Sequence, residues 1–296
     1  MSNTTLKHKI DFAVSLRVTN ANPNGNPLDG NRPRVTFDDH GEITDVAIKR
    51  KIRDRLMEVR DEHDKPKHKI FVQTDDRRAP NDEFKNLRER ADAALGKVSN
   101  TTKPKEYMDK ACKEWLDVRA FGQVFPFKAK RDSGGEGDTG VSIPIRGPVS
   151  IQSAFSLDKI NVVPTQITKG TSLEGDGVKR ASDQMGMKYR LEGDATYVLF
   201  GSINPQLAER TGFSDADAKA ILDVLPMLFE NDESTARPSG SMRVVQVVWL
   251  NHGTKSGKLS SAKVHDIFRN GLNPDGTFGD LNGPPDLPKP VIIPGF

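Results

Sequence analysis

The sequence predicts an α+β fold in which strands and helices follow one another in the order βαββαβ. An alternating strand is followed by an amphipathic helix near the N-terminus, and a strand, a helix and a strand follow one another from about residue 195 to residue 250. Further strand patterns lie between these two groups. Elements in this order form a sheet with helices packed on one face, as in ferredoxin-like and RRM-like proteins. We therefore expect such a sheet, interrupted by long insertions.

The first strand is predicted by an alternating segment. Between His8 and Thr19, apolar residues alternate with more polar ones. A period of two that is sustained in this way predicts a half-buried strand, with one face on the core. The residues predicted to face the core are Ile10, Phe12, Val14, Leu16 and Val18.

The first helix is predicted to begin after residue 44. Thr44 or Asp45 is its candidate N-cap, because a side-chain oxygen at that position accepts a hydrogen bond from a free amide of the first turn. We expect the helix to pack on the sheet through one narrow apolar stripe, which consists of Ile48, Ile52, Leu56 and Val59.

The same types of element return late in the chain. Residues 195–203, ATYVLFGSI, form a predicted strand. Ser214 is the predicted N-cap of a helix whose last turns are kinked or ended by Pro226. Residues 242–250, MRVVQVVWL, are apolar enough for a central strand of the sheet. These elements complete the predicted order.

Four segments interrupt or follow the predicted sheet. Residues 61–118 are charged and contain two helical patterns, and residues 126–140 form a predicted flexible loop. Residues 158–188 are predicted to protrude as a polar hairpin or loop. The tail at 283–296 is expected to be extended, because its prolines oppose both a helix and a strand ladder.

Composition limits the kinds of protein that this chain can be. The formal net charge over 296 residues is only +3, so a nucleic-acid surface has to arise from local clusters of basic residues. The single cysteine, Cys112, excludes an intramolecular disulfide and a zinc site built from cysteines, and we expect it to be buried. Residues 1–9 lack the apolar core of a signal peptide, and no run approaches the roughly 18 apolar residues of a membrane span. We therefore expect a soluble, cytoplasmic protein that does not enter a membrane.

Two phosphate-binding motifs are matched incompletely. Gly135–Gly140 reads GEGDTG, but it lacks the preceding strand and the following helix that a dinucleotide site requires. Gly253–Ser260 is similar to a P-loop, yet it has one residue too few between its glycines, and Leu259 replaces the Ser or Thr that binds magnesium. We interpret both as polar loops.

Catalytic and metal-binding motifs give no stronger signal. The six histidines form no metal-binding spacing, and the sequence has no G-x-S-x-G motif. Asp29, Asp38 and Asp39 follow the first strand, where an acid could bind magnesium, but acids also favour turns, and we prefer that second interpretation. We expect no catalytic residue, no metal and no cofactor.

Basic residues are concentrated on the first helix. Six of them lie between residues 49 and 60, against two acidic residues. Lys49 and Arg53 lie one turn apart on one flank, and Lys51 and Arg55 on another, so each pair could contact successive phosphates. A solvated face is the alternative, but the local excess of basic over acidic residues favours a phosphate-binding surface.

A polar segment precedes this helix and must lie beside it. Residues 20–34, NANPNGNPLDGNRPR, hold five asparagines, three prolines and two glycines, and they end in Arg32 and Arg34. Their asparagine side chains and backbone amides can bind phosphates or ribose hydroxyls. Aromatic residues make up only 6% of the chain, and the first strand has Phe12 alone, on its apolar face. We therefore expect recognition of a nucleic-acid backbone and not base stacking on the sheet.

Five segments together resemble the backbone subunit of type I-C Cascade, which is a CRISPR surveillance complex. Such backbone subunits belong to the crRNA-binding RAMP superfamily. They read VTNANPNGNPLDGNRPRV, DVAIKRKIRD, DVRAFGQVF, IRGPVSIQSAFSLDKI and MGMKYRLEGDATYVLFGSIN, in order from about residue 8 to residue 250. The resemblance implies a subunit shaped like a right hand. The implied parts are an RRM-like palm at 1–60, 119–157 and 189–270, a helical fingers insertion at 61–118, a β-hairpin thumb at 158–188 and an extended tail at 271–296.

The resemblance also implies what the protein binds. Copies of such a subunit polymerise along the crRNA into a helical filament and hold its backbone, while the spacer bases pair with target DNA in antiviral defence. The implied partners are crRNA, target DNA, neighbouring copies, a small crRNA-capping subunit and a large target-recognition subunit. The implied RNA-binding residues are Asn20, Asn22, Asn24, Arg32, Arg34, Lys49, Arg50, Arg53, Lys169, Lys179, Arg180 and Met185.

Two alternative functions stay open. Backbone subunits of the related type III complexes cleave target RNA, so Asp29 could serve a metal-dependent RNase. The type I-C motifs favour a subunit that is not an enzyme. A nucleotide-binding enzyme built on Gly135–Gly140 is the other alternative, and it predicts nucleotide binding in the absence of RNA.

Overall fold

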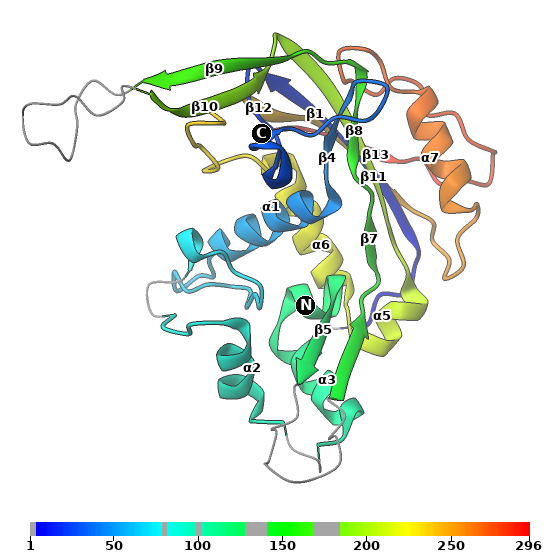
Figure 1. Cartoon of the computed structure of the whole chain (residues 1–296). Helices are drawn as coiled ribbons and strands as arrows, with labels where there is room; N and C mark the ends of the chain where they lie inside the picture. Colours follow the sequence, from blue (N-terminus) through cyan, green and yellow to red (C-terminus); the bar gives the residue numbers. More distant parts are fainter. Residues whose placement is uncertain (1–3, 79–81, 99–101, 128–140, 169–183) are drawn as a thin grey trace, which may run out of the picture.

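An antiparallel sheet runs through the centre of the structure (Figure 1). The computed structural model describes residues 4–78, 82–98, 102–127, 141–168 and 184–296. In this part of the chain the sheet has the order β13-β12-β1-β11-β8-β4, and β7 also pairs with β11. These strands are β1 (Ile10–Thr19), β4 (His40–Ile43), β7 (Val149–Ile151), β8 (Ala154–Lys159), β11 (Asp194–Ile203), β12 (Met242–Asn251) and β13 (Val291–Pro294).

Helices and smaller hairpins surround this sheet. The helices are α1 (Asp45–Glu58), α2 (Leu87–Leu95), α3 (Pro104–Glu114), α4 (Leu116–Phe121), α5 (Pro205–Thr211), α6 (Asp215–Val224) and α7 (Ser261–Asn270). Short 3-10 helices are η1 (Pro27–Asp29), η2 (Asp75–Arg77) and η3 (Leu225–Met227). The remaining strands form two-stranded sheets: β2 (Gly25–Asn26) with β3 (Arg32–Pro33), β5 (Gly122–Phe127) with β6 (Val141–Arg146), and β9 (Val162–Thr168) with β10 (Gln184–Leu191).

Helices α1 and α6 begin at the residues that the capping patterns predict. The Thr44 hydroxyl accepts a hydrogen bond from the amide of Ala47 at 3.2 Å, so Thr44 and not Asp45 is the N-cap of α1. Ser214 and Asp217 form a reciprocal capping box at the start of α6. Both predicted helices are therefore confirmed, together with the strands β1, β11 and β12 that precede or follow them.

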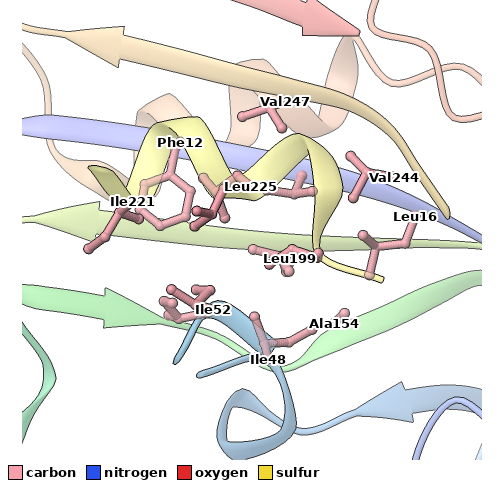
Figure 2. Close-up of a cluster of buried hydrophobic side chains, with 14 of the residues drawn as sticks. Phe12, Leu16, Ile48, Ile52, Ala154, Leu199, Ile221, Leu225, Val244 and Val247 are labelled. Atoms are coloured by element: carbon pink, nitrogen blue, oxygen red, sulfur yellow. The ribbon is translucent and has the colours of Figure 1, made fainter. Parts of the chain in front are cut away.

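The main hydrophobic core lies between the sheet and these two helices. Figure 2 shows Phe12 and Leu16 of β1 in the same cluster as Ile48 and Ile52 of α1 and Ile221 of α6. All five side chains are fully buried. Each such side chain contributes about 1.5–3 kcal/mol through removal of apolar surface from water. The predicted apolar faces of the first strand and the first helix are thus the faces that meet.

The second face of the sheet is covered as well, by α7. Val264 and Phe268 of α7 pack against Ala13 and Val248 of the sheet in a separate apolar cluster. The expectation of helices on one face only is therefore wrong. The expectation of a half-buried first strand is wrong too, because Asp11, Ala13 and Ser15 on that side of β1 are fully buried. The helix α7 is not among the elements that the sequence predicts.

The insertion after α1 builds a second core of its own. Trp115 separates α3 from α4, because its backbone is extended (φ −119°, ψ 128°). Its ring packs on Phe71 with 4.6 Å between the ring centroids. Phe125 of β5 and Ile143 of β6 join this cluster, so the β5–β6 hairpin packs with α3 and α4. The two predicted helical patterns of residues 61–118 correspond to α2 and to α3 with α4, whereas the described residues before α2 contain only the 3-10 helix η2.

The C-terminal tail forms a ladder, contrary to the expectation from its prolines. β13 pairs with β12 from Gln246↔Pro294 to Trp249↔Val291. The ladder is possible because β13 is the outermost strand and its prolines stand at the ends of the paired stretch. The tail therefore covers what would otherwise be the free edge of β12.

The β9–β10 hairpin projects from the sheet (Figure 1). It overlaps the segment 158–188 that is predicted to protrude and extends beyond it to Leu191. Residues 169–183 between its strands lie outside the described residues. The predicted loop at 126–140 and the Gly135–Gly140 motif fall mostly or wholly outside them too. Among the helices that the structure describes, none has the length and apolar character needed to cross a membrane.

Candidate nucleic-acid interface

The predicted RNA-binding segment 20–34 lies beside the base of the β9–β10 hairpin. Asn20 adopts a left-handed conformation (φ 49°), and its Oδ1 accepts hydrogen bonds from Nη1 of Arg190 (2.9 Å) and the amide of Gly193 (3.1 Å). The amide of Leu191 donates to the carbonyl of Ala21 at 3.0 Å. The segment thus holds the last residues of β10 against the end of β1.

The other two predicted asparagines make internal hydrogen bonds. Asn22 is buried, and its Nδ2 donates to the carbonyl of Asn31 at 2.6 Å. Oδ1 of Asn24 accepts from both the amide and the hydroxyl of Thr44, each at 3.0 Å. Asn24 therefore supports the N-cap of α1. Contact of Asn20, Asn22 and Asn24 with RNA stays a prediction.

The two arginines of the segment differ in their surroundings. Arg32 is exposed, and its guanidinium carbon lies 4.7 Å from the centroid of the Tyr189 ring of β10. Arg34 is half-buried, and its Nε is a buried donor without a hydrogen-bond partner among the described residues. We call the contact region of Asn20, Gly30, Arg32, Tyr189 and Arg190 the loop–hairpin joint.

The basic residues on α1 are paired with carboxylates to different degrees. Lys49 binds Asp45 at 2.8 Å, and both side chains keep access to solvent. Arg50 lies 3.6 Å from Asp54 and 3.4 Å from Asp76. These contacts leave Lys49 and Arg50 at the surface of the helix, where their role in RNA binding stays a prediction.

Arg53 is turned toward the helical insertion. Its Nε binds Oδ2 of Asp117 at 2.9 Å, and its guanidinium lies 5.1 Å from the centroid of the Phe121 ring. Only 13% of its side chain is exposed. The arginine therefore joins α1 to α4, and its predicted contact with RNA is untested.

Two further basic residues of α1 are used inside the protein. Lys51 is buried in an ion pair with Asp232. Burial lowers the pKa of Lys51, and the charge of Asp232 opposes that change. Arg55 binds Glu58 at 2.5 Å and the carbonyl of Glu230 at 3.1 Å. The flank of Lys51 and Arg55 therefore anchors the segment after η3.

The remaining predicted RNA contacts belong to the hairpin. Lys169, Lys179 and Arg180 lie outside the described residues. Met185 belongs to β10, but its side chain is not described. Within the described part of the hairpin, Lys188 and Arg190 supply the positive charge.

Two residues at this interface were missed by sequence reasoning. Tyr189 lies between Lys188 and Arg190, and an aromatic residue between two basic residues is a signal that could have indicated it. Asp117 interrupts the apolar run WLDVRAF, which suggests a buried carboxylate that needs a basic partner. Neither signal identifies the partner, because Asp117 and Arg53 are 64 residues apart in the chain.

Of the acidic residues considered for metal binding, Asp29 ends the 3-10 helix η1, and Asp38 and Asp39 lie in the turn before β4. Asp29, Asp38 and Asp39 are exposed, and Asp39 has a left-handed backbone (φ 65°). In the ranges that the structure describes, no group of three or more His, Cys, Asp or Glu side chains is arranged to hold a metal ion.

Cys112 and the Gly253–Ser260 loop have internal roles. Cys112 is buried as predicted, and burial raises the pKa of its thiol to about 11. In the loop, the amide of Lys258 donates to Nδ1 of His252 at 2.9 Å, and Nε2 of His252 lies 2.7 Å from the Asp11 carboxylate. His252 therefore carries its proton on Nε2, and the amide of Lys258 is directed inward.

Comparison with known proteins gives a family match along most of the chain. Residues 8–277 match the family model described as CRISPR-associated protein Cas7. A curated relative, CRISPR-associated protein Cas7 of Haloferax volcanii, is 29% identical over 230 residues, which cover 73% of this chain and 62% of the relative. The chain thus spans less than two thirds of the length of that relative.

Solved structures give weaker matches. A chain of a structure described as "CRISPR RNA-guided surveillance complex, pre-nicking" is 15% identical, with a TM-score of 0.45 over 81% of this chain and 75% of that chain. A chain of "Cryo-EM structure of the Type III-B Cmr-beta bound to cognate target RNA" is 11% identical, with a TM-score of 0.39 over 81% of this chain and 60% of that chain.

Proposed function

Because the chain belongs to the family of CRISPR-associated protein Cas7, we propose that it is the backbone subunit of a type I-C CRISPR surveillance complex. Copies polymerise along a crRNA and hold its sugar-phosphate backbone whatever the sequence, while the spacer bases pair with target DNA. In this proposal the main sheet with α1 and α6 is the RRM-like palm, the α2–α4 insertion is the fingers, and the β9–β10 hairpin is the thumb.

The observation that carries the proposal is the loop–hairpin joint. It places the exposed guanidinium of Arg32 on one side of the segment 20–34, beside the hairpin strand that bears Lys188 and Arg190. Guanidinium and ammonium groups bind phosphates without reading the bases. A guide RNA whose sequence varies requires this kind of contact.

The positions of the aromatic rings also support backbone recognition. Phe12, Tyr197, Phe200 and Trp249 of the main sheet are buried and not free to stack on a base, whereas Phe155 of β8 is 43% exposed. A single exposed ring does not form the platform on which an RRM stacks two or three bases. Sequence reading is therefore assigned to base pairing between the guide and its target.

The proposed partners follow from the same assembly. They are the crRNA, target DNA, neighbouring copies in a helical filament, a small crRNA-capping subunit and a large target-recognition subunit. The proposed location is the cytoplasm, without a membrane partner and without a cofactor.

Purification of the full chain after expression with a CRISPR array tests the proposal. The expected result is a large particle in which an RNA of uniform length copurifies with many copies of the chain, as shown by the ultraviolet absorbance ratio and by gel sizing. A monomer without bound RNA, which also fails to bind added crRNA, would contradict the proposed function.

We also propose that the subunit is not an enzyme. The alternative is a metal-dependent RNase like that of type III complexes, with Asp29 in its active site. Incubation of the filament with complementary RNA and magnesium separates the two. The expected result is intact RNA with the wild-type chain. Regularly spaced cleavage products that disappear in Asp29→Ala would support the RNase instead.

A further inference from the structure

Arg32 differs from most basic residues of α1 because its guanidinium forms no ion pair with a described residue. Its guanidinium is exposed, and in the part of the chain that the structure describes it has no carboxylate partner. Most basic residues of α1, by contrast, bind carboxylates. An arginine without an internal carboxylate keeps its five N–H donors available for an external anion.

The ring beneath Arg32 is fixed in place by the backbone around it. Tyr189 pairs with Pro164 across the hairpin, and the neighbouring Arg190 binds Oδ1 of Asn20 at 2.9 Å. Gly30 is a further neighbour of the ring, since an added Cβ would lie in van der Waals contact with Cε2 of Tyr189, at 3.8 Å. Gly30 also has a left-handed backbone (φ 55°), which favours glycine at this position.

A cation–π contact with Tyr189 does not occupy the N–H donors of the Arg32 guanidinium. A guanidinium that lies within about 6 Å of a ring centroid is attracted by the ring face, while its N–H donors lie in its own plane. With the Tyr189 ring on one face, these donors can form the paired hydrogen bonds that a phosphate accepts. The stacking also restricts the long Arg32 side chain before any ligand binds, so less rotamer freedom is lost on binding.

We propose that Tyr189 is a positioning residue that holds the Arg32 guanidinium ready for a phosphate of a bound single-stranded RNA. The proposal rests on the proposed function and adds to it a role for one residue that does not need to touch the RNA. The aromatic ring is the feature required, and the phenol hydroxyl is not.

A set of variants at the joint tests this role. Binding of an unstructured RNA of about 12 nucleotides is measured against salt concentration. Tyr189→Leu is expected to weaken binding about two- to fivefold, the effect of one exposed cation–π contact. Tyr189→Phe is expected to bind as the wild type does. Arg32→Ala is expected to reduce the slope of log K against log salt by about 0.7, as for one lost phosphate.

The double variant separates positioning from direct contact. If Tyr189 acts through Arg32, Arg32→Ala with Tyr189→Leu binds no more weakly than Arg32→Ala alone. Additive losses would show that Tyr189 contributes independently, and they would overturn the proposal. Unchanged affinity of Tyr189→Leu would overturn it too.

A matched control is available on the opposite face of the sheet. Arg269 of α7 lies over the Phe200 ring at 5.0 Å and also pairs with Asp266, so Arg269→Ala removes the same charge and the same kind of aromatic contact from an arginine that has an internal carboxylate. RNA affinity and salt slope are expected to stay at their wild-type values in this variant. Circular dichroism of every variant checks that it is folded.

Arg32→Lys provides a second test. This variant leaves the Tyr189 ring intact and keeps the positive charge, but it lacks the planar guanidinium. It is expected to bind RNA more weakly than the wild type, and equal binding would overturn the proposal.

The outcomes also distinguish this inference from the proposed function. If the wild-type chain binds RNA and only the Tyr189 variants lack the expected pattern, the positioning role alone fails. If the wild-type chain binds no RNA, both fail together.

Discussion

Nε of Arg53 on α1 lies 2.9 Å from Oδ2 of Asp117 on α4, and this ion pair joins the main sheet's helix to the helical insertion. The same carboxylate accepts hydrogen bonds from the amides of Phe71 (2.7 Å) and Val72 (3.1 Å). Asp117 is completely buried. Removal of Arg53 would therefore leave a buried carboxylate without its cation.

Arg53→Ala is expected to lower the free energy of unfolding by about 3 kcal/mol, because an unpaired buried charge is costly. Lys49→Ala, which breaks an exposed pair one turn away, is expected to cost less than about 0.5 kcal/mol. Urea unfolding of both variants checks this difference. Equal and small effects would show that Arg53 is free to serve RNA.

Asn24→Asp distinguishes a structural from an RNA-binding role of this asparagine. An aspartate still accepts hydrogen bonds from Thr44, and its charge is favourable at the start of α1, so stability is expected to change by less than about 0.5 kcal/mol. Close to a phosphate, the same charge would repel RNA.

The expected result for Asn24→Asp is therefore a stable protein that binds RNA more weakly at low salt, measured by fluorescence anisotropy. Asn24→Ala serves as the comparison, because it removes the support of the N-cap and is expected to cost about 1 kcal/mol. Unaltered RNA affinity of Asn24→Asp would place the phosphates away from this residue.

The ion pair of Arg119 and Asp217 predicts a dependence of stability on pH. Burial raises the pKa of Asp217, but hydrogen bonds and charge from Arg119 lower it, and the net pKa is below the ordinary value of 3.8. Because the folded state binds this proton less readily than the unfolded state, the pair stabilises the fold above pH 3.8 and loses its effect as pH falls through the folded pKa.

Asp217→Asn should reveal this effect in urea unfolding at neutral and acidic pH. At about pH 7 the variant is expected to be less stable than the wild type by about 3 kcal/mol, because Arg119 loses its carboxylate. The difference should shrink in acid. Asp215→Asn, which removes an exposed carboxylate of the same helix, is the control and should have little effect. A constant difference across the pH range would contradict the prediction.

The tail strand β13 predicts a contrast between two neighbouring positions. Ile293 pairs with Val247 and packs against the main core, whereas Val291 is 58% exposed. Ile293→Ala is expected to cost about 1–2 kcal/mol, and Val291→Ala less than about 0.5 kcal/mol. Thermal unfolding measures both. If Ile293→Ala were as harmless as Val291→Ala, the ladder of β13 would contribute little to the fold.

Local patterns predicted the elements whose signals are short in range. The alternation of β1, the apolar stripe of α1 and the caps Thr44 and Ser214 are properties of neighbouring residues, and the structure confirms them. The ladder of β13 was missed because it depends on a strand more than 40 residues away, which allows prolines at its ends.

The candidate site could be predicted only in part. The segment 20–34 was identified from its composition, and it does lie beside basic residues of the hairpin. What composition could not show is which side chains serve the protein itself. Asn24 and Arg53 have partners that are distant in sequence, so their internal hydrogen bonds become visible only when the chain is folded.

The position of α7 limits which surface of the sheet a nucleic acid can contact. In an RRM, the face of the sheet that the helices leave open binds the bases. In this protein that face is covered by α7, which packs on Ala13 and Val248. In the proposed complex, we therefore expect the guide strand to pass beside the main sheet, along the segment 20–34 and the β9–β10 hairpin, and not across the face of the sheet. On such a path the bases do not stack on the sheet, which is what pairing with a complementary strand requires.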